Sequence, residues 1–226
     1  MKGLTNNQLK MIALITMTLD HIGVVIFPQV EWLRIVGRLA FPLFAYMIAE
    51  GCRHTRSMGR YFATMAILAL GCQIVDFVVE KSLYQSILVT FSLSIGVIWL
   101  LKTAREKKKP IWLLLGATAI AAVYFVCQIL PELLPGTDFC IDYDFIGVMV
   151  PVLVYLGKNK DQRLMFLTIG LVALSANLVK IQWYCLLAVP LLLLYNGQRG
   201  KWKMKWLFYI YYPLHLAAIY GISILL

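Results

Sequence analysis

The sequence is poor in charged residues and in histidine. Only 14% of its 226 residues are charged and three are histidines, whereas 61% are hydrophobic. A soluble domain carries about a quarter charged residues, so this composition disfavours a soluble globular fold. Intrinsic disorder is excluded because disordered chains are poor in aromatic residues, and 13% of this chain is aromatic. The composition is typical of an integral membrane protein.

Paired cysteines and the common catalytic motifs are missing as well. The five cysteines include no CxxC pair, which excludes a disulfide scaffold. The three histidines lack metal-ligand spacing, so no metal is expected. The sequence contains no P-loop, HExxH, GxSxG or EF-hand pattern. We also expect no cleaved signal peptide, because the first apolar run ends at Pro28 without a small-residue cleavage site.

Long apolar segments occupy most of the chain. About 20 apolar residues are needed to cross the ~30 Å hydrocarbon layer of a bilayer. Nine candidate spans meet or approach this length: 8–27, 33–52, 60–79, 83–101, 111–130, 143–157, 164–179, 182–197 and 206–225. The sequence therefore predicts an all-α, multi-pass membrane protein that forms a single transmembrane helical domain over 1–226.

Basic residues gather in alternate gaps between these spans. Seventeen of the 21 lysines and arginines lie there: Lys2, Lys10, Arg53, Arg56, Arg60, Lys102, Arg105, Lys107, Lys108, Lys109, Lys158, Lys160, Arg163, Arg199, Lys201, Lys203 and Lys205. The positive-inside rule then predicts a cytoplasmic N-terminus and an external C-terminus. The net charge of +10 thus marks the cytoplasmic face, and a nucleic-acid partner is not expected.

Several ionisable residues fall at membrane depth, where each costs about 2.5–3.5 kcal/mol and is functional or paired by default. They are Asp20, His21, Arg38, Glu50, Asp76 and His215. Adjacent residues on a helix point about 100° apart, so Asp20 is a poor partner for His21. We expect Asp20 to pair with Arg34 or Arg38 on the next span. For Glu50, Asp76, Tyr212 and His215, a role near the substrate and a structural role both remain open.

Lys10 and His21 lie eleven residues apart, which places them near one helix face and about 16 Å apart along its axis. One interpretation is that a long substrate lies along this stripe, its anionic end at Lys10 and its reactive end at His21. The other is that Lys10 is an interface lysine and His21 a hydrogen-bonded structural residue. Likewise, Arg53, Arg56 and Arg60 form either a phosphate clamp or a topological charge cluster.

The sequence resembles the TraX family of bacterial membrane proteins. The similar blocks are LKMIALITMTLDHIG (9–23), LRIVGRLAFPLFAYMIAEG (33–51), RHTRSMGRY (53–61), LLLLYNGQRG (191–200) and LFYIYYPLHL (207–216). In the third span the chain has CQIVDFVVE, with Asp76 retained and Gln73 where the family has a glutamate.

This resemblance implies a bacterial inner-membrane protein that acetylates the N-terminus of pilin. It also implies a relationship to transmembrane acyltransferases, which include the family 3 acyltransferases and the heparan-α-glucosaminide N-acetyltransferases. Acetyl-CoA or another acyl-CoA would then be the co-substrate. The resemblance implies that Lys10 with Arg53, Arg56 and Arg60 binds CoA and that His21 is essential.

Two functions follow as hypotheses. In the first, the protein moves an acyl group from cytoplasmic acyl-CoA to an amine or hydroxyl of an exported peptide or glycan. His21 is then the general base, near Asp20 and Arg38, and the oxyanion donor is Arg38, Tyr212 or a backbone N–H. In the alternative, the protein is a non-enzymatic transporter or an assembly factor for a surface structure. The sequence does not predict an oligomeric state.

Overall fold

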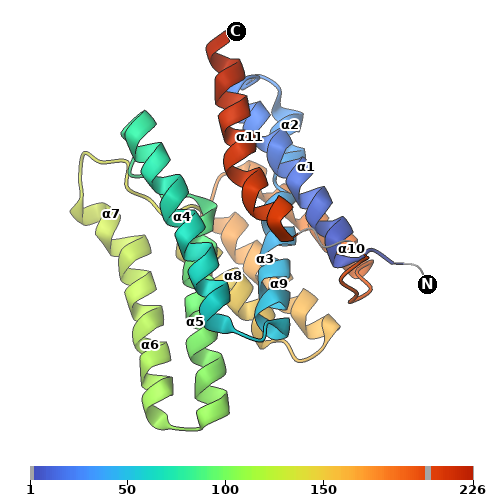
Figure 1. The fold of residues 1–226 in the computed structure, drawn as a ribbon, viewed down its shortest axis with the longest axis vertical. Coiled ribbons are helices and arrows are strands. Elements are labelled where there is room, and N and C mark those ends of the chain that lie inside the picture. The colour runs from blue at the N-terminus through green and yellow to red at the C-terminus, as the bar shows by residue number, and fades with distance from the viewer. Residues whose placement is uncertain (1–2, 202–204, 226) are drawn as a thin grey trace. The chain divides into compact units, whose positions relative to one another are not determined.

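The computed structural model describes residues 3–201 and 205–225, so Lys2 and Lys203 lie outside the described residues. The described residues form helices (Figure 1), and their extended pairings are two isolated bridges. The chain forms two compact units. We call Met1–Met47 with Leu167–Leu226 the discontinuous unit and Ile48–Phe166 the central unit.

The discontinuous unit is built around the first helix. Its elements are α1 (Asn6–Val25), α2 (Glu31–Gly37), the first part of α3 (Ala40–His54), most of α9 (Lys160–Asn177), the 3₁₀ helix η2 (Lys180–Leu187), α10 (Ala188–Leu193) and α11 (Lys205–Leu225). Helix α1 packs against α2 and against α11, which runs beside it (Figure 1), and α2 also packs against η2. Residues far apart in sequence therefore meet on α1.

The central unit is built around α5. It contains the end of α3, the start of α9, and α4 (Met58–Glu80), α5 (Ile87–Lys107), α6 (Pro110–Tyr124), the π-helical turn η1 (Phe125–Ile129), α7 (Leu130–Leu133) and α8 (Asp144–Leu156). Helix α5 packs against α4, α6 and α8. It is accordingly the most enclosed of this unit's long helices, with half of its most apolar window buried.

Five helical segments are long and apolar enough to cross a membrane. They are Asn6–Val25, Glu31–His54, Met58–Glu80, Ile87–Lys107 and Pro110–Leu133. In α4 and in the α6–α7 segment only 17% of the most apolar window is buried, so side chains such as Ile67 and Val79 are exposed. An outward apolar face of this kind is stable in lipid and costly in water. The described helices thus have the character of a multi-pass membrane protein.

The predicted span 33–52 is not one continuous helix. It is interrupted at Arg38–Leu39, between α2 and α3. Pro42 explains the break, because proline has no N–H for the carbonyl of Arg38 four residues earlier and its ring displaces that carbonyl. The backbone N–H of Arg38 contacts the carbonyls of Arg34 at 3.1 Å and Ile35 at 3.3 Å, which tightens the last turn of α2. Arg38 therefore stands at a break in the helix.

The predicted span 182–197 also differs from a regular α-helix. Residues Lys180–Leu187 form the 3₁₀ helix η2, and α10 follows it. Pro190 lacks the N–H that would bond the carbonyl of Leu186 in an α-helix, so a tighter pattern is favoured there. Because a 3₁₀ helix rises about 2.0 Å per residue, η2 and α10 together reach about 25 Å. This short segment is therefore nearly as long as the hydrocarbon layer is thick.

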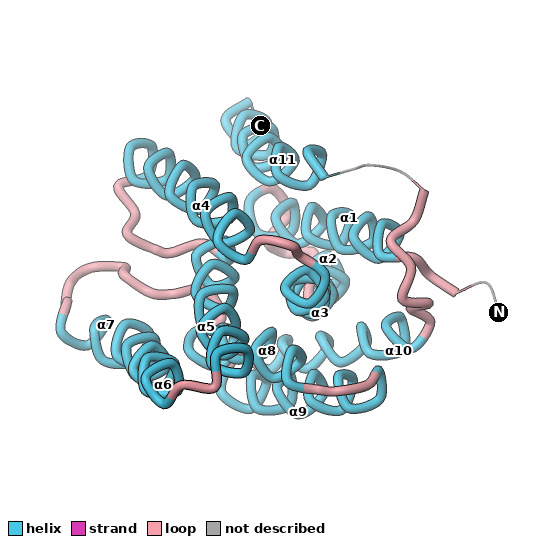
Figure 2. The backbone as a smooth tube through the Cα atoms, turned by 60° about the horizontal axis from the view of Figure 1, so that its bottom comes forward, coloured by secondary structure: helices cyan, strands magenta, loops and turns pink. Residues whose placement is uncertain are grey.

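Within each unit, segments that are distant in the sequence contact each other near the ends of helices. In the discontinuous unit, Leu4 bridges to Tyr195, and the segment before α1 lies beside the one after α10 (Figure 2). In the central unit, Gln85 bridges to Ile141. Also in the central unit, Arg53 donates hydrogen bonds to carbonyls at the C-terminal end of α8. Each of these three contacts links residues in or beside two gaps that the charge pattern assigns to one side of the membrane.

Candidate functional site

Helix α1 holds Lys10 and His21 on one continuous helix. Thr5 and Gln8 cap its N-terminus: the Gln8 N–H donates to Thr5 Oγ1, and the Thr5 N–H donates to Gln8 Oε1 at 2.9 Å. The helix then runs to Val25 without interruption. The predicted spacing of Lys10 and His21 therefore holds, at about 16 Å along the axis. Both side chains are half-buried.

Asp20 forms ion pairs with the two arginines that the sequence suggests. Its Oδ2 lies 3.3 Å from Nη1 of Arg34 and accepts a close hydrogen bond from Nη2 of Arg38. Gly37 makes this approach possible, because a Cβ at position 37 would lie 2.2 Å from Oδ1 of Asp20. Asp20 thus joins α1 to α2 and to the helix break that follows it.

Arg38 also contacts η2. Its Nη1 donates to Oε1 of Gln182 at 3.3 Å, and both residues are buried. Since Asp20 supplies one negative charge to two guanidinium groups, the cluster keeps a net positive charge. Such a charge could stabilise a developing oxyanion. Gln182 was not predicted as a site residue, although an amide inside an apolar run was a signal.

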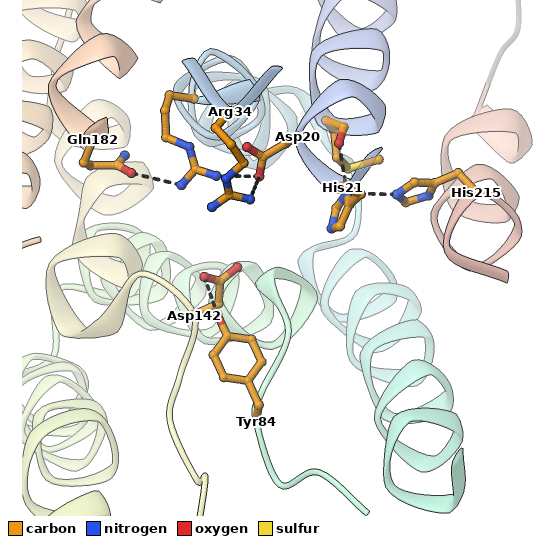
Figure 3. Close-up of polar contacts among 9 residues, drawn as sticks. Asp20, His21, Arg34, Tyr84, Asp142, Gln182 and His215 are labelled. Carbon is orange, nitrogen blue, oxygen red and sulfur yellow. Dashed lines mark hydrogen bonds and ion pairs between the residues drawn. The ribbon is translucent and has the colours of Figure 1, made fainter. Parts of the chain in front are cut away.

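His21 lies against His215 of α11 (Figure 3). Nδ1 of His21 is 3.2 Å from Nε2 of His215 and 2.9 Å from the carbonyl oxygen of Met17. The two rings meet edge to face, with their centroids 4.9 Å apart. His215 is buried at 6% exposure, and its Nδ1 lies 3.0 Å from the carbonyl oxygen of Tyr211. These histidines are 194 residues apart, and no sequence pattern predicted their contact.

Two tyrosines of α11 surround His215. The ring of Tyr211 stacks on it at 5.3 Å, and the buried ring of Tyr212 meets it edge to face at 5.5 Å. The hydroxyl of Tyr211 shares a hydrogen bond of 2.7 Å with that of Thr18 on α1. His215 and Tyr211 are therefore both tied to α1. Asp20 and His21 point to different sides of α1 (Figure 3), as expected for neighbours on a helix.

Glu50 is buried in the central unit, where it contacts Arg163 and His54. Its carboxylate is 3% exposed and forms an ion pair with Arg163 at the start of α9. Nε2 of His54 lies 3.6 Å from its other oxygen. The ion pair with Arg163 joins the end of α3 to α9.

The three arginines predicted to bind CoA differ in their surroundings. Arg53 donates to the carbonyls of Tyr155 and Gly157, and its guanidinium lies 5.2 Å above the ring of Tyr155. Arg56 and Arg60, in contrast, are exposed. A small pocket of about 190 Å³ is lined by Arg56, Met58, Trp99, Lys102, Thr103 and Glu106. Arg53 thus supports the end of α8, whereas Arg56 and Arg60 can reach a ligand.

Asp76 and Gln73 lie one turn apart on α4. Asp76 is half-buried and has no hydrogen bond or ion pair within residues 3–201 and 205–225. Both amide atoms of Gln73 are buried without a hydrogen-bond partner in the same part of the chain. Among the described residues, no group of three His, Cys, Asp or Glu side chains could hold a metal ion.

In the central unit, the loop after α4 forms exposed hydrogen bonds with the loop before α8. The carboxylate of Asp138 accepts hydrogen bonds from the Ser82 hydroxyl at 2.5 Å and from the backbone N–H of Leu83 at 2.8 Å. These bonds stabilise the ionised carboxylate and hold its pKa below the usual range. Tyr84 also donates from its hydroxyl to Asp142 at 2.7 Å (Figure 3).

Comparison with known proteins assigns the family. Residues 5–223 match the TraX protein family. Over 94% of its length the chain is 26% identical to the probable fimbrial assembly protein FimC, serogroup H1, of Dichelobacter nodosus, covering 93% of that protein. A 44-residue stretch, 19% of this chain and 18% of the other, is 48% identical to an uncharacterized protein of Rickettsia prowazekii (strain Madrid E). No solved structure matches the chain. Because the match extends over nearly the whole sequence, this chain belongs to the TraX protein family.

Proposed function

We propose that this protein is a bacterial inner-membrane factor for the assembly of a surface structure of the fimbrial type. The observation that carries the proposal is the full-length similarity to a relative named as a probable fimbrial assembly protein. The similarity covers both units, so the relative has counterparts of both. The apolar outward faces of α4 and α6 support a place in the membrane.

The proposal includes nine membrane crossings with a cytoplasmic N-terminus. Two observations support it. The basic residues lie in alternate gaps. The three loop contacts also join residues in or beside gaps that are separated by two, four or eight predicted spans, which are even numbers and return the chain to the same side. A missing span between joined segments would place them on opposite faces.

The geometry of the discontinuous unit favours a second function, acyl transfer, within the same assembly role. Its support is the His21–His215 contact together with the Asp20–Arg38 ion pair, all within the packing of α1 against its neighbours. A partly accessible imidazole held by a second ring suits a general base. The positively charged cluster beside Arg38 suits a developing negative charge.

The proposed reaction is direct transfer from a thioester. The nitrogen of an acceptor amine attacks the carbonyl carbon of the acyl-CoA, and His21 takes the proton that the nitrogen loses. The tetrahedral intermediate then collapses, the carbon–sulfur bond breaks, and the electron pair leaves with the sulfur. The proton on His21 goes to this sulfur, so the products are an amide and CoA thiol. A hydroxyl acceptor gives an ester by the same steps.

The co-substrate would approach from the cytoplasmic face. Lys10, Arg56 and Arg60 lie at segment ends that the charge pattern assigns to that face, and their cationic groups suit the phosphates of CoA. The pantetheine arm would extend along α1 for the ~16 Å between Lys10 and His21. An exported peptide or glycan would supply the acceptor.

The experiment is a deletion strain complemented with three versions of the gene: wild type, His21→Ala and the control His54→Asn, which changes a histidine with a largely exposed side chain. Surface fibres are counted by electron microscopy, and the mass of their subunits is measured. We expect the deletion to lose fibres and both wild type and His54→Asn to restore them. Normal fibres in the deletion strain would contradict the assembly role. A His21→Ala strain with fully acylated subunits would contradict acyl transfer.

A further inference from the structure

The hydrogen-bond partners of the two histidines determine which ring nitrogens carry hydrogen. Nδ1 of His21 lies 2.9 Å from the carbonyl oxygen of Met17, and Nδ1 of His215 lies 3.0 Å from that of Tyr211. A carbonyl oxygen only accepts hydrogen bonds. Each Nδ1 must therefore be the donor, so both rings carry hydrogen on Nδ1.

Only one placement of the hydrogens on the ring nitrogens then fits the contact between the two rings. Nε2 of His215 is 3.2 Å from Nδ1 of His21, which already carries a hydrogen. A hydrogen on Nε2 of His215 would face that hydrogen directly, so Nε2 must be unprotonated and accept. His215 is thus neutral, and the Nδ1–H of His21 is shared between His215 and the carbonyl of Met17, as in other three-centre hydrogen bonds.

The remaining nitrogen of the pair is Nε2 of His21. Within the described residues, 3–201 and 205–225, no hydrogen bond is made to this atom. It therefore keeps its lone pair for a reactant. Asp20, the neighbouring carboxylate, does not compete for the ring, because its charge is engaged by Arg34 and Arg38.

The position of His215 is set by aromatic packing. Tyr211 stacks on its ring with an interplanar angle of 10°, and Tyr212 covers it at 70°. The hydroxyl contact of Tyr211 with Thr18 fixes this arrangement relative to α1. This aromatic packing therefore aims the lone pair of His215 at His21.

We propose that His215 is a positioning residue that holds His21 as the Nδ1–H tautomer, so that Nε2 of His21 is the atom that takes the proton in the reaction. The inference rests on the proposed acyl transfer. Nε2 of His21 accepts the proton from the attacking amine and returns it to the leaving sulfur. During the step, the Nδ1–H of the charged His21 ring strengthens its hydrogen bond to Nε2 of His215. His215 supports this charge without carrying one and does not take the proton itself.

The first test is independent of activity. Protein labelled with ¹³C,¹⁵N-histidine and carrying His54→Asn, so that only the pair contributes, is examined by solid-state NMR in lipid at neutral pH. Correlation of each ring nitrogen with its neighbouring carbons identifies the protonated atom. We expect Nδ1 protonated and Nε2 bare on both rings. A protonated Nε2 with a bare Nδ1 on either ring overturns the proposal. An inactive protein with the expected tautomers would contradict acyl transfer alone.

The second test uses two variants that differ in reach. The amide oxygen of His215→Gln can occupy the place of Nε2 and accept from His21. The shorter His215→Asn reaches only the place of Nδ1. We expect His215→Asn to lower kcat about tenfold, the effect of one lost hydrogen bond, with the KM for acyl-CoA unchanged. We expect His215→Gln to recover most of the rate. Full activity of His215→Asn, or equal loss in both variants, would overturn the proposal.

Discussion

A Cβ on Gly37 would lie 2.2 Å from Oδ1 of Asp20 and 2.4 Å from its Cβ. Because Gly37 has no side chain, the carboxylate of Asp20 can approach α2 and reach Arg34 and Arg38. Gly37 and Asp20 are 17 residues apart in the sequence and meet where α1 packs against α2.

The first prediction concerns this contact. Gly37→Ala should lower the free energy of unfolding by about 1–3 kcal/mol, because overpacking forces α1 and α2 apart. Gly71→Ala in α4 is the matched control, since nothing lies within 4 Å of a Cβ there. We expect that control to keep or slightly raise stability. The measurement is thermal unfolding of both variants in detergent. Equal melting temperatures would contradict the packing.

The second prediction separates the two arginine partners of Asp20. Asp20→Asn leaves Arg38, whose side chain is 10% exposed, without its counter-ion. The loss of one partner of a buried pair costs about 3–5 kcal/mol. Arg34→Gln should cost about 0–1 kcal/mol, because that side chain is 29% exposed and water screens its charge. Denaturant unfolding of the two variants measures the difference, and an Arg34→Gln variant as unstable as Asp20→Asn would refute this order.

The third prediction distinguishes Arg53, in the last turn of α3, from Arg56 and Arg60. Arg53→Ala should lower the melting temperature, because the carbonyls of Tyr155 and Gly157 lose their donor. Arg53→Lys should recover little, since an ammonium does not reproduce the guanidinium fork. A stable Arg53→Ala protein would contradict this structural role.

The exposed Arg56 and Arg60 should behave in the opposite way. Replacement of both by alanine should leave the melting temperature unchanged and weaken acyl-CoA binding. The weakening should be greatest at low salt, where exposed charges are least screened. Titration calorimetry at two salt concentrations measures it. Unchanged affinity would show that these arginines serve topology alone.

The sequence predicts the helical fold well where local patterns decide it. Apolar runs give α1, α4 and α8 within a few residues, and the pairing of Asp20 with Arg34 or Arg38 follows from the cost of a lone charge in a membrane. The break at Arg38 was readable from Pro42, four residues later, but the apolar character of the surrounding segment concealed it.

The pairing of His21 with His215 was not predictable in this way. It depends on which helix packs beside α1, and the partner, α11, lies at the other end of the chain. Single-sequence patterns carry periodicity but no long-range pairing. Gln182 was missed for the same reason, because its contact with Arg38 depends on the packing of α2 against η2.

The fourth prediction concerns pH and the loop contact at Asp138. The pKa of this exposed carboxyl is held below its usual value of about 3.9 by hydrogen bonds from Ser82 and Leu83. A lowered folded-state pKa gives stability that is fully present above the unfolded-state pKa and is lost as the pH falls through the folded-state value. Hydrogen exchange of the Leu83 amide should therefore gain protection as the pH rises from 3 to about 6, relative to a model peptide. Asp138→Asn should remove this dependence, and its persistence in that variant would rule out Asp138 as the cause.

The proposed function joins a role in the assembly of a surface structure to acyl transfer by means of His21. Its most direct measurement incubates the purified protein in lipid with isotope-labelled acetyl-CoA and the subunit of the surface structure. Wild type and His54→Asn should release one CoA thiol for each acetyl group that mass spectrometry finds on the subunit, whereas folded His21→Ala should do neither. Equal labelling by His21→Ala, or no labelling by wild type while the deletion strain still loses its fibres, would contradict the enzymatic account.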